Sequence, residues 1–153
     1  MFTGIMIAAV VGMALMMAND LRDALEKVSL LLPNGAANTT STGLETGVRT
    51  SLGVPARPID YVLTAPLLTT TQQPDAKTMK YDILVSDNLD MSSPTTYITT
   101  ALTQTGAGSA GCAAATFTFA LPSNINKKYV GIKATGSASG DSSAASATLE
   151  ALA

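Results

Sequence analysis

The stretch Thr78-Met79-Lys80-Tyr81-Asp82-Ile83-Leu84-Val85 decides the fold. Its odd-numbered positions are large and apolar, and the polar residues Lys80 and Asp82 fall between them. Successive side chains of a β-strand point to opposite faces of the sheet, so this two-residue period is typical of a strand with one buried face. We therefore expect a strand over 78–85.

The same period recurs on both sides of this stretch. Phe117, Phe119 and Leu121 alternate with small or polar residues, and so do Val130 and Ile132. The expected strands are Ile59–Leu63, Thr78–Val85, Tyr97–Thr103, Ala114–Leu121, Tyr129–Thr135 and Ala145–Leu152. Because the strands are short and the loops between them are rich in Gly, Ser, Asn and Pro, we expect a mainly β domain over 59–153. Its architecture would be an antiparallel β-sandwich or jelly roll.

The beginning of the chain has a different pattern. From Phe2 to Ala18 the side chains are almost wholly apolar. Beyond this run Leu21, Leu25 and Val28 recur at helical spacing, which predicts an apolar α-helix, or two joined helices, over 1–32. Pro33 would end it.

The apolar run allows two interpretations. Its length of about 17 residues is the lower limit for crossing a membrane, but the helix could equally pack against protein, and methionine adapts well to irregular apolar surfaces. A secretory signal is disfavoured because no Lys or Arg precedes the run. If the helix packs against protein, it would tether this chain to its partners. The residues of that tether would be Phe2, Ile5, Met6, Met13, Met16, Met17, Leu21, Leu25 and Val28.

Residues 33–58 have neither helical nor strand periodicity. The segment Ala36–Gly43 lacks bulky side chains, and Pro55 and Pro58 disfavour a helix. We interpret this region as a linker or extended arm. The expected organisation is therefore a helical tether over 1–32, a linker over 33–58 and a β domain over 59–153.

The composition excludes several classes of function. The chain has no histidine, so a Ser-His-Asp triad cannot form within it, and the usual acid/base catalyst near neutral pH is missing. The basic residues are scattered except for Lys127-Lys128, which argues against nucleic-acid binding. Cys112 lies among small residues and is interpreted as a small apolar filler. We expect no enzyme, no catalytic residue and no cofactor.

Two local patterns resemble ligand sites in part. Asp82, Asp87, Asn88 and Asp90 form the densest acidic group, and carboxylates can bind calcium, but their spacing does not match an EF-hand loop. We interpret them as a polar hairpin turn and predict no metal. The segment Gly106–Gly111 lacks the Gly-Lys-Ser/Thr ending of a phosphate loop, so we expect a loop between strands.

Three segments carry a resemblance to a known family. They are Tyr81–Asn88, a strand that runs into a Ser-Asp-Asn turn; Phe117–Asn124, with Leu-Pro at the strand end; and Lys128–Gly136, with a basic residue before Tyr-Val-x-Ile. In these segments the chain resembles the jelly-roll cement or decoration proteins, the head-stapling proteins, of tailed bacteriophage capsids. The resemblance covers the C-terminal β region. The apolar N-terminal helix departs from the family pattern.

This resemblance implies a non-enzymatic structural protein of the virion, located on the surface of the head. It implies binding to the major capsid protein at subunit boundaries. Separately, because aromatic residues are scarce and the core would be thin, we expect self-association as a homodimer or homotrimer. The alternative is a membrane-anchored, pilin-like or surface structural subunit, in which the apolar helix crosses the bilayer. No glutamate lies within the apolar run and no cationic leader precedes it, and both observations disfavour a pilin. A membrane partner belongs only to this alternative.

Overall fold

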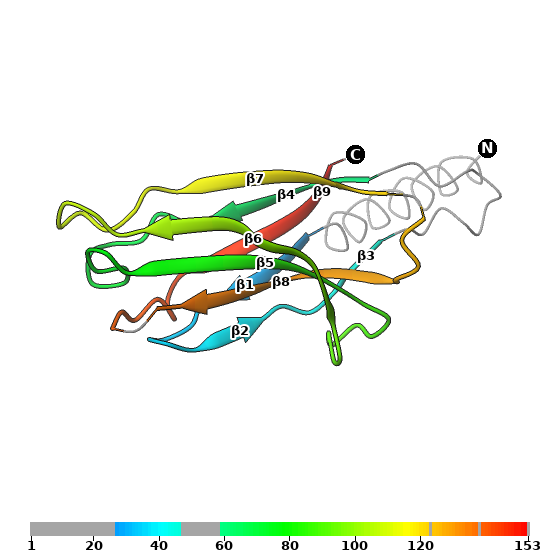
Figure 1. Ribbon diagram of the computed structural model, residues 1–153, viewed down its shortest axis with the longest axis horizontal. Helices are drawn as coiled ribbons and strands as arrows, with labels where there is room; N and C mark the ends of the chain where they lie inside the picture. The colour runs from blue at the N-terminus through cyan, green and yellow to red at the C-terminus, as the bar shows by residue number, and fades with distance from the viewer. Residues whose placement is uncertain (1–26, 47–58, 123, 138, 153) are drawn as a thin grey trace, which may run out of the picture.

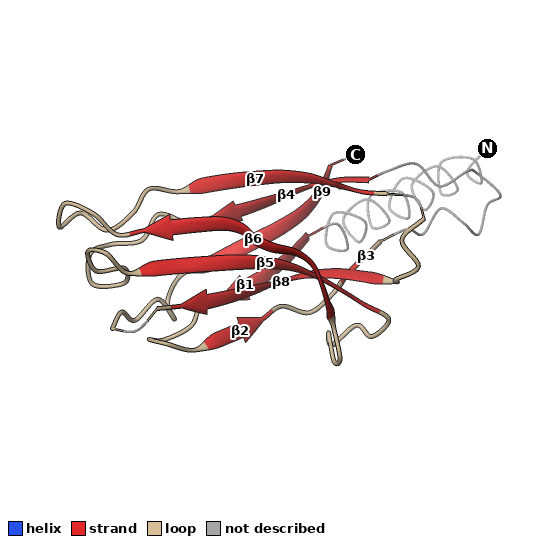
Figure 2. Cartoon of the chain, in the orientation of Figure 1, coloured by secondary structure: helices blue, strands red, loops and turns tan. Residues whose placement is uncertain are grey.

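The structure, a computed structural model, describes residues 27–46, 59–122, 124–137 and 139–152 of the 153-residue chain. These residues form strands and loops but no helix (Figures 1 and 2). The strands are β1 (Lys27–Leu31), β2 (Asn38–Thr40), β3 (Leu44–Glu45), β4 (Ile59–Ala65), β5 (Thr78–Ser86), β6 (Thr95–Thr105), β7 (Ala115–Leu121), β8 (Tyr129–Gly136) and β9 (Ser146–Leu152). Accordingly, no described segment is a helix with the length and hydropathy needed to span a membrane.

The strands form two antiparallel sheets. The first sheet has the order β1-β9-β4-β7, and the second has the order β2-β8-β5-β6. The two-residue strand β3 also pairs with β8, through Leu44 opposite Val130. Figure 1 shows the two sheets as layers with their strands running nearly along the long axis of the molecule. The expected antiparallel β-sandwich is therefore confirmed.

The order of pairing identifies the sandwich as a jelly roll. The hairpin β5·β6 is innermost in the sequence, and it is enclosed in turn by the pairs β4·β7, β2·β8 and β1·β9. This is a long hairpin of four strand pairs, rolled so that alternate pairs fall in opposite sheets. Pairing of β4 with β9 and of β5 with β8 then completes the two sheets. Eight strands in this double Greek-key arrangement define the jelly-roll architecture.

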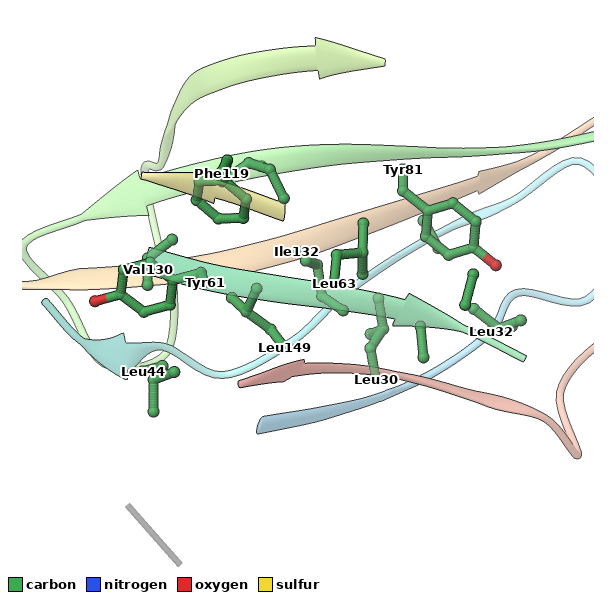
Figure 3. Close-up of a cluster of buried hydrophobic side chains, with 14 of the residues drawn as sticks. Leu30, Leu32, Leu44, Tyr61, Leu63, Tyr81, Phe119, Val130, Ile132 and Leu149 are labelled. Carbon is green, nitrogen blue, oxygen red and sulfur yellow. The ribbon is translucent and has the colours of Figure 1, made fainter. Parts of the chain in front are cut away.

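The core lies between the two sheets and follows the alternation seen in the sequence. Tyr61 and Leu63 of β4 lie in this core with Ile132 of β8 (Figure 3). Ile83 of β5 belongs to the same buried cluster, and all four residues are inaccessible to solvent. The Tyr61 ring stacks on Phe119 with their centroids 5.5 Å apart. Burial of a large apolar side chain contributes about 1.5–3 kcal/mol, so these residues dominate the stability of the fold.

A buried polar network closes one end of the core. The Tyr81 hydroxyl donates to Oε1 of Gln104 at 2.8 Å. The Gln104 amide nitrogen donates in turn to the carbonyl oxygens of Pro66 and Ala113, both at 2.8 Å. Because a buried polar group without a partner costs about 1–3 kcal/mol, this network lets a tyrosine and a glutamine occupy the core. It also joins β6 to the loops beside it.

The six strands expected from the sequence are all present. The structure extends most of them by one or two residues and begins β7 and β9 one residue later than expected. The segment Gly106–Gly111 is the loop between β6 and β7, as expected. For β4, β5, β7, β8 and β9 the alternation of residue types was sufficient because each has one face in the core, whereas β6 is mostly exposed and only Gln104 is buried.

The predicted helix over 1–32 is wrong for its last residues. Lys27–Leu31 is strand β1, paired with β9 from Lys27 opposite Glu150 to Leu31 opposite Ser146. Val28 and Leu32 are four apart, which fits a helix, but with Leu30 they also fit a two-residue period. The strand is preferred because it buries Leu30 and Leu32 in the core and leaves Leu31 64% exposed. Residues 1–26 lie outside the described residues.

The predicted linker over 33–58 is wrong for its first part. Residues 38–40 form β2 and residues 44–45 form β3, and both pair with β8. Between them, the Ser41 hydroxyl accepts the Ile132 amide hydrogen at 3.0 Å, and Ser41 is buried. The β domain therefore begins by Lys27 rather than at Ile59. Residues 47–58 lie outside the described residues.

Candidate functional site

Of the nine predicted tether residues, the structure describes one. Phe2, Ile5, Met6, Met13, Met16, Met17, Leu21 and Leu25 lie outside the described residues. Val28 lies in β1, where it is partly buried and packs against the core. It is therefore part of a sheet rather than of a helix, and its role in binding a partner stays a prediction.

The best-defined surface feature is the loop between β5 and β6. Figure 1 shows this loop projecting from the ends of the two strands, past β8. It contains Asp87, Asn88 and Asp90, so the predicted polar hairpin turn is confirmed. Asp82 does not join them, because it lies within β5, where it pairs with Lys133 at 3.1 Å.

Short-range hydrogen bonds fix the shape of this loop. The backbone amide of Asn88 donates to the Ser86 hydroxyl at 3.1 Å. The backbone amide and the hydroxyl of Ser92 both donate to Oδ1 of Asp90, at 2.9 and 2.7 Å. These bonds favour the ionised carboxylate and lower the pKa of Asp90. The Asn88 side-chain amide also donates to the Ser92 carbonyl at 3.2 Å, so the Asp90 and Asn88 side chains hold the loop itself.

An apolar contact anchors the loop to the sheet beneath it. Met91 is only 3% exposed and has a φ of +54°. Its side chain lies over Gly131 of β8, where an added Cβ would come within 3.0 Å of the methionine methyl carbon. Gly43 also leaves space for the Met91 side chain, since a Cβ at position 43 would lie 3.2 Å from the Met91 sulfur. The Gly43 amide also donates to the Leu89 carbonyl at 2.7 Å.

A hollow lies between this loop and two neighbouring segments of the same chain, at Thr42 and at Tyr129. We call it the loop hollow; it has a volume of about 500 Å³ and is widely open to solvent. Its lining consists of Thr42, Asp87, Asn88, Leu89, Asp90, Ser92 and Tyr129. Leu89 is 57% exposed beside it, and Asp87 pairs with Lys127 at 2.6 Å.

The chemistry of the loop hollow suits contact with a protein surface. Its carboxylates already have partners, and no group of three or more potential metal ligands occurs in the part of the chain that the structure describes. Small-molecule sites usually enclose their ligand, whereas this hollow is open. A protruding side chain of another protein could enter it and contact Leu89 and Tyr129.

The other candidates from the sequence occupy structural positions. Cys112 is partly buried against the core, and burial raises the pKa of its thiol, as expected of an apolar filler. Lys127 forms the ion pair with Asp87. Sequence reasoning missed Leu89 and Tyr129 as parts of one surface, because they come from segments that only the fold brings together.

Comparison with known proteins gives a fold class but no family. The chain is a member of the jelly-roll class of two-sheet β-sandwiches by its own topology. No family model matches it, and no curated protein matches it at a significant level.

Several solved structures are distantly similar. A chain of the tomato aspermy virus structure has a TM-score of 0.44 and 9% identity, over 82% of this chain and 73% of that one. The K3 cleaved adhesin domain of Lys-gingipain from Porphyromonas gingivalis has a TM-score of 0.39 and 13% identity, over 82% and 70%. A chain of infectious bursal disease virus has a TM-score of 0.35 and 15% identity, over 82% and 28%. At these values the similarities assign neither a family nor a function.

Proposed function

We propose that this chain is a non-enzymatic structural protein of a tailed-bacteriophage virion. In this proposal it binds the shell of major capsid protein on the surface of the head and cements neighbouring subunits. Two observations support it. The chain has the topology of a jelly roll, and the three segments that resemble phage cement proteins correspond to β5, β7 and β8 with the turns that follow β5 and β7.

The observation that carries the proposal is the fixed, partly apolar loop beside the loop hollow. Met91 and the bonds of Asp90 hold the loop in place, while Leu89 remains 57% exposed. A surface that is already ordered loses little conformational entropy when it binds. Burying Leu89 fully would contribute about 1–2 kcal/mol to each contact. This is small for one copy, but many copies on one shell would stabilise it together.

The experiment compares two exposed leucines. Leu89→Asp places a charge at the loop hollow, and Leu67→Asp is the matched control. Leu67 is 63% exposed and lies in the loop after β4, at the opposite end of the sandwich (Figure 1). We expect wild-type protein and Leu67→Asp to cosediment with heads of the encoding phage and to raise the temperature at which the heads break. Leu89→Asp should bind about tenfold more weakly.

Two results would contradict the proposal. The first is wild-type protein that neither binds heads nor raises their melting temperature. The second is recovery of the native protein only from a detergent-extracted membrane fraction, which would favour the alternative of a membrane-anchored, pilin-like subunit. Equal binding by the two leucine variants would overturn the role of the loop hollow.

A further inference from the structure

Within the residues that the structure describes, the first sheet has the edge strands β1 and β7, and the second sheet has β6 at one edge and β2, followed by β3, at the other. An edge strand presents unpaired amide and carbonyl groups, so it can pair with a strand of another chain. Proteins usually prevent this with short strands, charged residues, prolines or bulges at the edge.

Three of these edges are protected in such ways. β2 has three residues, and β1 begins with the exposed Lys27. β6 is interrupted at Thr100, which has a φ of +53° and whose amide hydrogen is taken by Asp82 at 2.8 Å. The pairing of β6 with β5 shifts register at the same place.

β7 has none of these protections. It pairs with β4 residue for residue, from Ala115 opposite Ala65 to Leu121 opposite Ile59, without a register shift. It contains neither proline nor a charged residue, and the whole stretch from Met91 to Asn126 is uncharged. Thr116, Thr118 and Ala120 are exposed on its outer face. β7 is thus the most regular of the four edges.

One hydrogen bond shows which backbone groups of β7 point outward. The Tyr97 hydroxyl of β6 donates to the Ala120 carbonyl at 3.4 Å, so this carbonyl is directed away from β4. In an antiparallel ladder, alternate residues direct both backbone groups to the same side. Thr116 and Thr118 therefore direct their amide and carbonyl groups outward as well.

We propose that β7 pairs with β7 of a second copy of this chain, antiparallel about a two-fold axis at Thr118. This register places Thr118 opposite Thr118 of the second copy and Thr116 opposite Ala120, so the outward backbone groups meet in hydrogen-bonding phase. The Ala120 carbonyl would accept the Thr116 amide of the second copy on its second lone pair or in place of the Tyr97 hydroxyl. Phe117 would lie opposite Phe119, and aromatic and Thr–Thr pairs both favour antiparallel pairing.

The symmetry explains why the second copy suits this edge better than an unrelated strand does. A two-fold axis brings a residue against its own copy, so a charged residue there would meet a like charge. β7 has only uncharged residues, and its stretch Thr116-Phe117-Thr118-Phe119-Ala120 nearly matches its own reverse about Thr118. The pairing would join the two four-stranded sheets into one. It goes beyond the proposed function and does not depend on it.

Cross-linking tests the register in the purified full-length chain. In a background with Cys112→Ala, Thr118→Cys would face its own copy at a Cα separation of about 5.5 Å, which a disulfide can span. Thr64→Cys is the matched control, because Thr64 is exposed on the same sheet but lies in β4, paired on both sides. We expect mild oxidation to give a disulfide-linked dimer about tenfold faster with Thr118→Cys. Equal rates would overturn the proposal.

A second measurement avoids the cysteine variants. In sedimentation experiments, Thr118→Lys should weaken self-association about tenfold, and Thr64→Lys should leave it unchanged. In wild-type protein, the amide hydrogens of Thr116, Thr118 and Ala120 should gain protection from exchange as protein concentration rises. Protection that is independent of concentration would mean that a segment of the same chain covers the edge. That result, or the absence of protection, would overturn the proposal.

Discussion

Asp82 is the residue that holds the irregular edge strand β6 in shape. Its carboxylate accepts the amide hydrogen of Thr100 and pairs with Lys133. Thr100 is β-branched, and such residues avoid a positive φ, which costs roughly 1–2 kcal/mol. The bond to Asp82 offsets part of this cost. The Asp82 side chain therefore helps to hold the irregular backbone of β6 at Thr100.

Replacing Asp82 should cost more stability than replacing its cationic partner. Asp82→Ala removes a charge-assisted hydrogen bond and should lower the free energy of unfolding by about 1–3 kcal/mol. Lys133→Met removes only the ion pair, whose cationic end is partly exposed, and should cost less than about 1 kcal/mol. Urea unfolding followed by circular dichroism measures both. Equal losses would show that the ion pair, rather than the bond to Thr100, matters.

At the scale of an element, the β5–β6 loop depends on glycines that are remote in sequence. Gly131→Ala would bring a Cβ within 2.9 Å of the Ser41 hydroxyl and 3.0 Å of the Met91 methyl carbon. Such overpacking typically costs about 1–3 kcal/mol. We expect Gly131→Ala to lower the unfolding free energy by this amount.

A double-mutant cycle with Met91→Ala isolates the contact. If the loop rests on Gly131, the loss caused by Gly131→Ala should be smaller when Met91 is already truncated. The nearby Gly136→Ala is not a suitable control, because its Cβ would approach the Gly35 carbonyl within 2.3 Å. Additive losses in the cycle would contradict the proposed anchoring of the loop.

The strands that the sequence predicts most clearly are those in which apolar and polar residues alternate over several positions. β5, β7 and β8 each contain three or more alternating apolar residues. β1 could not be assigned, because Val28, Leu30 and Leu32 satisfy a strand period while Val28 and Leu32 also satisfy a helical one. Its partner β9, more than a hundred residues away, decides the matter. β2 and β3 are too short to carry any period and exist only because β8 pairs with them.

The candidate site was predictable to a similar extent. Asp87, Asn88 and Asp90 indicated a turn, because such residues bond to nearby backbone. The anchoring by Met91 could not be predicted, since the glycines beneath it come from the β2–β3 connection and from β8. Glycines at those positions indicated loops or weak strand positions, and nothing in the local sequence related them to Met91.

For the whole molecule, the core tyrosines predict how stability depends on alkaline pH. Burial disfavours the phenolate; it raises the pKa of Tyr61 to about 12 and raises the pKa of Tyr81 as well. An unfolded chain releases these protons near pH 10, and the folded chain keeps them. Stability is therefore complete below about pH 10 and falls as the pH rises toward 12, by at most about 1.4 kcal/mol per pH unit for each buried tyrosine.

Urea unfolding at several pH values between 8 and 12 checks this expectation. Tyr61→Phe keeps the stacked ring and removes the ionisable group, so it should reduce the slope by about half. A slope unchanged by this substitution would mean that Tyr61 ionises equally in the folded and unfolded chains.

The nesting of the strand pairs has a consequence for how the molecule is made. β9 lies between β1 and β4 in the first sheet, although it is the last strand in chain order and β1 is the first. During synthesis, β1 and β4 cannot be joined until β9 has left the ribosome. Before then β5 can pair with β6 and, once β8 has been made, with β8, but the first sheet stays incomplete. Such non-local pairing folds slowly, on a scale of milliseconds to seconds. The nascent chain must keep its exposed strand edges from aggregating until translation has passed β9.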